Sequence, residues 1–177
     1  TGSPPAGNLT VVGDRPAGLR QWVSDVEFQR WNGWPYQWDE DDAQYVAPQV
    51  EGIEEMTLQV TGENYLNLAD ATDVESLTVE GGSSLDINNV AGSLTSFDAS
   101  AMEGAVTADL IGSGTLTKIA GGAGDDAITA DIGKIGPKAE IAGGEGVDTL
   151  TLQGAGTITN MAGFENVVLD GADGDVT

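Results

Sequence analysis

The chain has 177 residues, of which 29 are acidic and 6 are basic, so its net charge is −23. This charge excludes binding to nucleic acid or to anionic membrane surfaces, because few cationic side chains are available to neutralise phosphates. The absence of cysteine and histidine excludes disulfides, thiolate nucleophiles, imidazole bases and the common zinc sites, and no run of about 18 apolar residues is present to insert into a bilayer. We therefore expect no catalytic activity in this chain.

Residues 1–48 form a tryptophan-rich segment that we expect to be a cap or small subdomain, separate from a repeat array over residues 49–177. All four tryptophans lie in it, at Trp22, Trp31, Trp34 and Trp38. They fit either a cap over the open end of a solenoid or a stacking platform for cell-surface glycan or a neighbouring subunit. The acidic run at residues 39–42 is typical of a solvated linker.

Short segments between residues 50 and 170 alternate apolar with threonine or other polar residues, which is the period of a β-strand. Threonine on the outward positions favours strands, and glycine-rich segments between them indicate turns. The clearest strand segments are Met56–Val60, Leu77–Val79, Thr115–Ile119, Thr149–Leu152 and Val167–Leu169.

Apolar residues also recur at intervals of 19 to 23 residues, in two interleaved series. Two series in one period of about 22 residues predict two strands per rung, facing each other across a shared core. The sequence therefore predicts an all-β fold, a parallel β-solenoid or β-roll of about five rungs. The first series is Ile53, Val74, Phe97, Ile119, Ile141 and Phe164, and the second is Leu66, Leu85, Val106, Ile128 and Leu150. Segments 97–107, 119–129 and 141–151 align without a gap.

Two nine-residue segments, 121–129 and 143–151, share the pattern GGxGxD followed by a spacer, an aliphatic residue and threonine. Glycines allow backbone conformations that bring carbonyl oxygens together, and the aspartate adds a carboxylate; Ca²⁺ binds such oxygens. Since the copies are 22 residues apart, their loops should lie against each other with Ca²⁺ between them. The alternative is that the glycines make tight corners and the aspartates cap them. The candidate ligands are Gly121, Gly122, Gly124, Asp126, Gly143, Gly144, Gly146 and Asp148, with Asp125 less certain.

Further acidic residues could extend the site. Asp170 continues the 22-residue step after Asp148 and is a candidate third ligand, although it directly follows a strand. Asp173 and Asp175, in the acidic glycine-rich tail, are weaker candidates. Asp98 and Glu103 fit solvated surface acids better than ligands. Segment 130–140 lacks the GGxGxD pattern and carries two lysines, so we expect no calcium at that edge.

The two nonapeptides resemble RTX repeats, and the wider pattern resembles bacterial S-layer proteins of the RTX type. The wider resemblance rests on segment 95–107, which contains SFDAS, and on the related strand segments 53–58, 74–79 and 164–169. It implies a secreted, calcium-dependent surface-layer protein or adhesin that a type I system exports in one step and that folds outside the cell. It also implies that copies of the chain associate with one another.

These observations favour a structural, calcium-stabilised segment of a secreted bacterial cell-surface protein that self-assembles. Two alternatives stay open: an adhesin or carbohydrate-binding module that uses the tryptophan cluster, and a non-catalytic RTX module of a secreted enzyme. Thr1 is not followed by a charged-then-apolar leader, and residues 171–177 form an acidic glycine-rich stretch. We expect the chain to be a piece of a longer protein.

Overall fold

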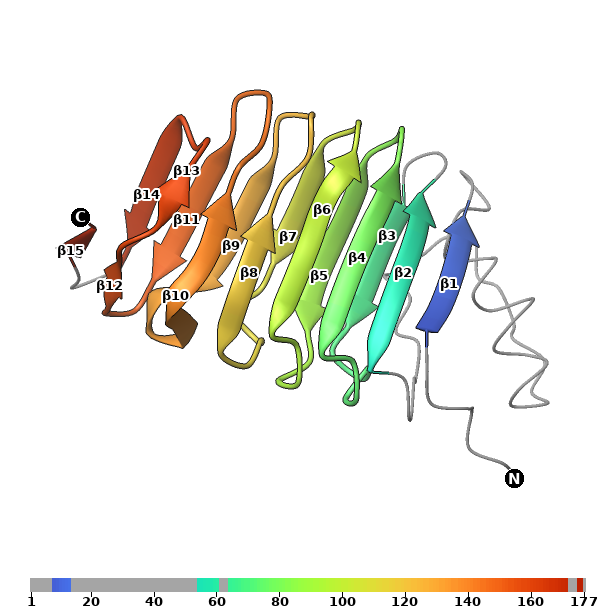
Figure 1. The fold of residues 1–177 in the computed structure, drawn as a ribbon, viewed down its shortest axis with the longest axis horizontal. Helices are drawn as coiled ribbons and strands as arrows, with labels where there is room; N and C mark the ends of the chain where they lie inside the picture. Colours follow the sequence, from blue (N-terminus) through green and yellow to red (C-terminus); the bar gives the residue numbers. More distant parts are fainter. Residues whose placement is uncertain (1–7, 14–53, 61–63, 172–174, 177) are drawn as a thin grey trace, which may run out of the picture.

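The protein is an elongated β-solenoid made of two facing parallel sheets (Figure 1). The structure is a computed structural model that describes residues 8–13, 54–60, 64–171 and 175–176. Within these ranges no α-helix is present, and the only helical element is the short 3-10 turn η2 (Ile132–Lys134). The predicted all-β parallel solenoid is confirmed.

The two sheets contain seven and six strands, and every pair of neighbouring strands is parallel. Sheet A contains, in spatial order, β1 (Asn8–Gly13), β2 (Glu55–Val60), β4 (Ser76–Gly81), β6 (Ser96–Met102), β8 (Leu116–Ala120), β10 (Ile135–Ala142) and β13 (Met161–Ala162). Sheet B contains β3 (Asn64–Leu68), β5 (Leu85–Val90), β7 (Val106–Asp109), β9 (Ala127–Asp131), β11 (Thr149–Gln153) and β14 (Asn166–Asp170). Two short strands, β12 (Thr157–Ile158) and β15 (Asp175–Val176), pair separately.

Each rung consists of one strand from each sheet. The first five rungs are β2–β3, β4–β5, β6–β7, β8–β9 and β10–β11, and β13–β14 forms a sixth, shorter one. The loops that lead from sheet A to sheet B form what we call the upper edge, at the top of Figure 1; they include residues 103–105, 121–126, 143–148 and 163–165. The returning loops form the lower edge.

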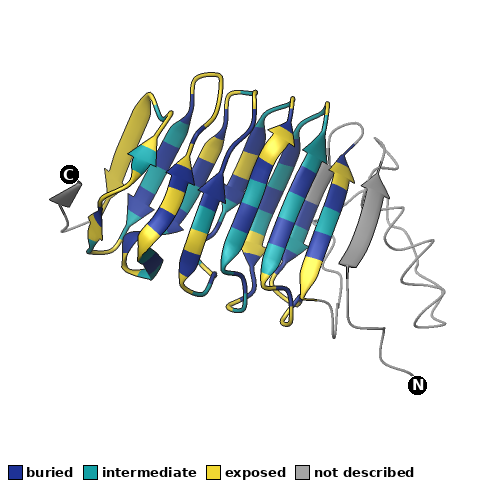
Figure 2. Ribbon diagram, viewed as in Figure 1, coloured by how far each residue is buried: buried dark blue, intermediate teal, exposed yellow. Residues whose placement is uncertain are grey.

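The core lies between the sheets, because alternate residues of each strand point inward. In β4, Leu77 and Val79 are buried while Thr78 faces outward, and in β11 Leu150 and Leu152 are buried on either side of Thr151. Figure 2 shows this alternation along the central strands, whereas β14 is exposed along its whole length. The predicted outward threonines are therefore confirmed in these strands.

The pairing register confirms part of each predicted apolar series. Phe97, Ile119 and Ile141 stack in sheet A, Leu85 stacks on Val106, and Ile128 stacks on Leu150. The other steps between described residues are wrong. The partner of Phe97 is Leu77 rather than Val74, the partner of Ile141 is Met161 rather than Phe164, Leu66 pairs with Ile87, and Ile128 pairs with Ala108. Ile53 lies outside the described residues.

The gapless alignment of the third and fourth rungs was also wrong, by two residues. Thr107 pairs with Ala127 instead of Thr129. Asp98 pairs with Ala120, the last residue of β8. Strand β6, however, continues for four more residues, to Met102. The third rung thus uses two more residues to reach sheet B than the glycine-rich fourth rung does.

Part of the N-terminal segment pairs with the array, and the boundary expected near residue 48 stays a prediction. Residues Asn8–Gly13 form β1, which pairs with β2 in register and covers its edge. Such coverage is what a solenoid end requires. The tryptophans, and the linker expected at residues 39–42, lie outside the described residues.

Candidate metal centre

The loops 121–126 and 143–148 lie directly against each other at the upper edge, as the sequence predicts. Glu145 N–H donates to the carbonyl of Gly122 at 2.9 Å, and Thr149 N–H donates to the carbonyl of Asp126 at 2.8 Å. Val147 N–H donates to the carboxylate of Asp125 at 2.8 Å. Main-chain groups of the two loops are therefore paired across the step between the fourth and fifth rungs.

The six predicted glycines are needed because the loops stack too closely for a side chain. A Cβ atom at Gly121 would lie 2.0 Å from the carbonyl oxygen of Gly143, and one at Gly143 would lie 1.9 Å from that of Gly163. Gly144 and Gly146 also have φ values of 118° and 116°, which non-glycine residues rarely adopt. At Gly122 and Gly124 a Cβ atom would lie 2.3 and 2.5 Å from main-chain atoms of the third rung.

The Asp126 carboxylate is buried and its two oxygens accept hydrogen bonds from main-chain N–H groups. Oδ1 accepts from Val106 at 2.8 Å and Oδ2 accepts from Gly122 at 2.6 Å. Burial raises the pKa of Asp126, these two hydrogen bonds lower it, and the charges of Asp148 and Asp125 raise it further, with a net upward shift. Asp126 thus acts as the corner cap that was the alternative interpretation of its motif.

Asp148 occupies the same place one rung further on, but only one of its two carboxylate oxygens has a hydrogen-bond partner. Its Oδ1 accepts from the N–H of Asp126 at 2.8 Å, whereas its Oδ2 is buried and has no hydrogen-bond partner. Gly144, unlike Gly122, has a positive φ, and no hydrogen bond from Gly144 reaches the carboxylate. Burial raises the pKa of Asp148, the hydrogen bond from Asp126 lowers it, and the charges of Glu165 and Asp125 raise it.

The third member of this series is Glu165, which the sequence analysis missed. Its Oε2 accepts from the N–H of Asp148 at 2.8 Å, in the way that Asp148 accepts from Asp126. A step of 22 residues pointed to Asp170, but the last rung is shorter and the step from Asp148 is 17 residues. Gly163, two residues before Glu165, is the sequence signal for this position, because it occupies the place that Gly143 occupies in the rung before.

The candidate acid Asp170 lies away from this place. Asp170 is at the far end of β14, about 13 Å along the strand from the upper edge, where it accepts from Gln153 Nε2 at 3.2 Å. Asp170 therefore does not continue the series, which corrects the sequence interpretation. Asp175 begins β15 and pairs with Thr157, and Asp173 lies outside the described residues.

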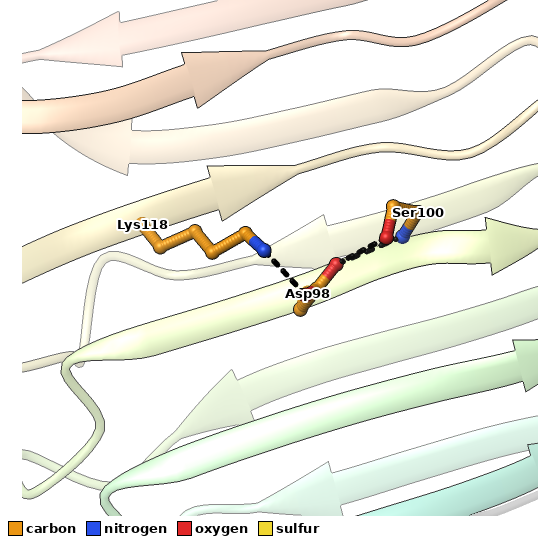
Figure 3. Close-up of polar contacts among 3 residues, drawn as sticks. All are labelled: Asp98, Ser100 and Lys118. Atoms are coloured by element: carbon orange, nitrogen blue, oxygen red, sulfur yellow. Dashed lines mark hydrogen bonds and ion pairs between the residues drawn. The ribbon is translucent and has the colours of Figure 1, made fainter.

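Asp98, on the outer face of β6, is satisfied by protein groups (Figure 3). Its carboxylate forms an ion pair with Lys118 on β8 and accepts from the backbone and side chain of Ser100. Burial raises the pKa of Asp98, but the hydrogen bonds from Lys118 and Ser100 outweigh it and hold the pKa below its ordinary value. Asp98 is therefore no free oxygen ligand.

The lower edge has a different chemistry in the fourth rung. Asp131 caps η2 by accepting from Gly133 N–H at 2.9 Å, and Lys134 Nζ donates to the carbonyl of Ile111 at 2.7 Å. A cation of the protein itself thus bridges the third and fourth rungs there. This arrangement agrees with the expectation of a calcium-free lower edge at segment 130–140, which stays a prediction.

The donor set at the upper edge is suited to Ca²⁺, which binds carboxylate and carbonyl oxygens. In the described ranges, no group of three or more acidic side chains converges closely enough to hold a metal by side chains alone. A cation here would need main-chain carbonyls as well. The carboxylate with an oxygen that lacks a partner is that of Asp148, whereas both oxygens of Asp126 accept a hydrogen bond.

Comparisons of the chain with protein-family models, curated proteins and solved structures give no significant match. Over the residues that the structure describes, no helix is long and apolar enough to cross a membrane.

Proposed function

We propose that this chain is a structural, calcium-stabilised segment of a secreted bacterial cell-surface protein that associates with copies of itself. The single observation that carries the proposal is the buried, unpartnered Oδ2 of Asp148. A buried polar atom without a partner costs about 1–3 kcal/mol, and more when it is charged. A divalent cation at the upper edge would remove that cost, whereas no described donor does.

The overall charge supports the same proposal. With 29 acidic and 6 basic residues, the chain repels itself when it is compact. Acidic residues of the upper edge are also stacked from rung to rung. The charges of Glu165 and Asp125 raise the pKa of Asp148 there, in addition to its burial. Cations that bind only the folded chain would stabilise it by mass action, by about 2.7 kcal/mol per site at one hundred times Kd.

In the described part of the chain, sheet B has an apolar edge strand that a further strand can cover. Strand β14 continues the core register, with Val167 on Leu150 and Leu169 on Leu152, yet Val167 and Leu169 are 38% and 47% exposed. An apolar edge strand favours pairing with a further strand, either of the same protein or of another copy. A structural role fits a molecule whose described part consists of stacked rungs.

The proposal is tested by circular dichroism and thermal unfolding in calcium and in chelator. We expect β-structure and the midpoint temperature to rise with millimolar calcium and to fall when chelator is added. Asp148→Asn keeps an oxygen acceptor for Asp126 N–H but removes the charge, so its response to calcium should be clearly smaller. Glu145→Gln, an exposed acid in the same loop, is the matched control and should respond like the wild type.

An unchanged spectrum and midpoint in chelator would contradict the calcium-stabilised function. Equal losses in both variants would indicate diffuse screening instead of a defined site. Binding of glycans that is lost on Trp34→Ala would favour the adhesin alternative, and calcium binding without any association would favour the accessory module of a secreted enzyme.

A further inference from the structure

The unpartnered oxygen of Asp148 points to a specific place, between the fifth and sixth rungs. A Cβ atom built on Gly143 would lie 2.6 Å from Asp148 Oδ2 and 1.9 Å from the carbonyl oxygen of Gly163. The two oxygens therefore both lie within 2.6 Å of one point beside Gly143. Both are acceptors, and no donor satisfies Asp148 Oδ2.

The equivalent place one rung earlier is different. Asp126 Oδ2 and the carbonyl oxygen of Gly143 converge in the same way on Gly121. There, however, Gly122 N–H donates to Asp126 Oδ2, so a positive partner is already present. The two corners are geometrically related, but the Asp126 oxygen has a donor and the Asp148 oxygen has none.

Glu165 brings a second carboxylate to the corner without a donor. Its Oε2 accepts a hydrogen bond from Asp148 N–H at 2.8 Å. The charge of Glu165 raises the pKa of Asp148, and its effect is larger than the effect of the charge of Asp125. Glu165 is exposed, so its carboxylate is reached from solvent, while Asp148 Oδ2 lies buried behind it. Lys118 and Lys134 are engaged elsewhere, with Asp98 and with the carbonyl of Ile111.

We propose that Glu165, Asp148 and the carbonyl oxygen of Gly163 form a site for a hard divalent cation between the fifth and sixth rungs. The inference rests on the proposed calcium-stabilised function and deepens it, because it adds Glu165, from a segment without the GGxGxD pattern, as a ligand. It also places the ion on the far side of the 143–148 loop from the 121–126 loop.

Calorimetric titration of the whole chain with calcium chloride tests this assignment, with Glu165→Gln as the variant and Glu145→Gln as the control. The amide introduced by Glu165→Gln keeps an oxygen acceptor for Asp148 N–H, so only the charge is lost. We expect calcium affinity to fall by at least the roughly tenfold loss that follows removal of an outer-shell partner, while the control stays within twofold of the wild type. In chelator, Glu165→Gln should unfold at the same temperature as the wild type or higher.

A double variant, Asp148→Asn with Glu165→Gln, adds a test that does not depend on either single variant alone. Two ligands of one ion should give losses that are not additive. The inference is overturned if Glu165→Gln binds calcium like the wild type while Asp148→Asn does not, which would leave the proposed function standing. It is also overturned if Glu165→Gln lowers only the stability in chelator, as a purely structural cap would. A wild-type chain that binds no calcium would contradict both proposals.

Discussion

Three aspartates of this chain differ in what their neighbours supply. Asp98 has a lysine and a serine as partners, and its pKa is lowered despite partial burial. Asp126 has two main-chain donors, and Asp148 has one donor and an unpartnered oxygen. Burial outweighs these bonds in the latter two, whose pKa values are raised. The charge of a residue therefore predicts its role only once its partners are known.

A pH dependence follows for the calcium-free protein. Because the pKa of Asp148 is raised above 3.8, the folded chain binds this proton more tightly than the unfolded chain does. Its contribution to stability therefore falls as pH rises from about 3.8 through the raised value. In chelator at pH 7, we expect Asp148→Asn to be more stable than the wild type by about 1–3 kcal/mol, and the difference to vanish as pH falls towards 3.8.

Denaturant unfolding of both proteins between pH 4 and pH 7 measures this difference. Asp98, whose pKa shift has the opposite sign, is present in both proteins and cancels in the comparison. A difference that stays constant over this range would mean that the Asp148 carboxylate does not titrate as its burial requires.

At the scale of the elements, the upper-edge corners are defined by backbone stacking. Gly121, Gly143 and Gly163 follow one another, and the Cα atoms of Gly121 and Gly143 each face the carbonyl of the next glycine. Each corner is then tied to the neighbouring rung by a carboxylate that accepts a main-chain N–H, through Asp126, Asp148 and Glu165. The glycines allow the approach and the acids fix the register, so both halves of the motif have a structural task before any ion binds.

Replacement of Gly143 by alanine should separate steric need from chain flexibility. The new methyl group would meet the Gly163 carbonyl at 1.9 Å, so the loop must shift, and we expect a loss of about 3 kcal/mol, as for overpacked sites. Gly92→Ala is the control, since its nearest atom is 3.7 Å away and its φ is not positive; such a change is neutral or stabilises by about 0.4–1 kcal/mol. Chemical unfolding in calcium measures both, and equal effects would contradict the stacking argument.

At the scale of the whole molecule, the described array is an elongated stack that ends on one side in the exposed strand β14 (Figures 1 and 2). Its apolar residues favour contact with another surface, while the net charge of −23 opposes contact between copies. Cations shift this balance by screening or by binding. Association should therefore depend on which ion is present if binding at defined sites is the cause.

Calcium should promote association at concentrations where magnesium does less, because magnesium dehydrates reluctantly and requires octahedral geometry. Light scattering and electron microscopy at matched ionic strength measure this.

Val168→Lys, on the outward face of β14, should reduce association, because lysine on an edge strand opposes pairing. Thr129→Lys is the control, since Thr129 lies in the same outward row but inside the sheet. If the two ions act alike, screening is sufficient; if the two variants act alike, the end of the sheet is not the contact.

The sequence by itself determined the architecture and the main corner residues. Alternation with a period of two follows from the pleat of a strand, so it is visible locally at Leu77–Val79 and Thr149–Leu152. The spacing of the two GGxGxD copies placed their loops on adjacent rungs, because residues one period apart stack in a solenoid. Both features are properties of the chain read over one or two periods.

Only the tertiary structure decided the register at irregular rungs and the pairing of each carboxylate. The longer β6 shifts the pairing partner of Thr107 by two residues, and the short last rung brings Glu165 instead of Asp170 to the upper edge. Strand β1 pairs with β2 at a sequence separation of 47 residues. Hydrogen bonding between rungs fixes these positions, and the sequence does not record how many residues a connection needs to complete its turn. For the same reason, the GGxGxD pattern alone could not distinguish Asp126, which has both donors, from Asp148, which has one.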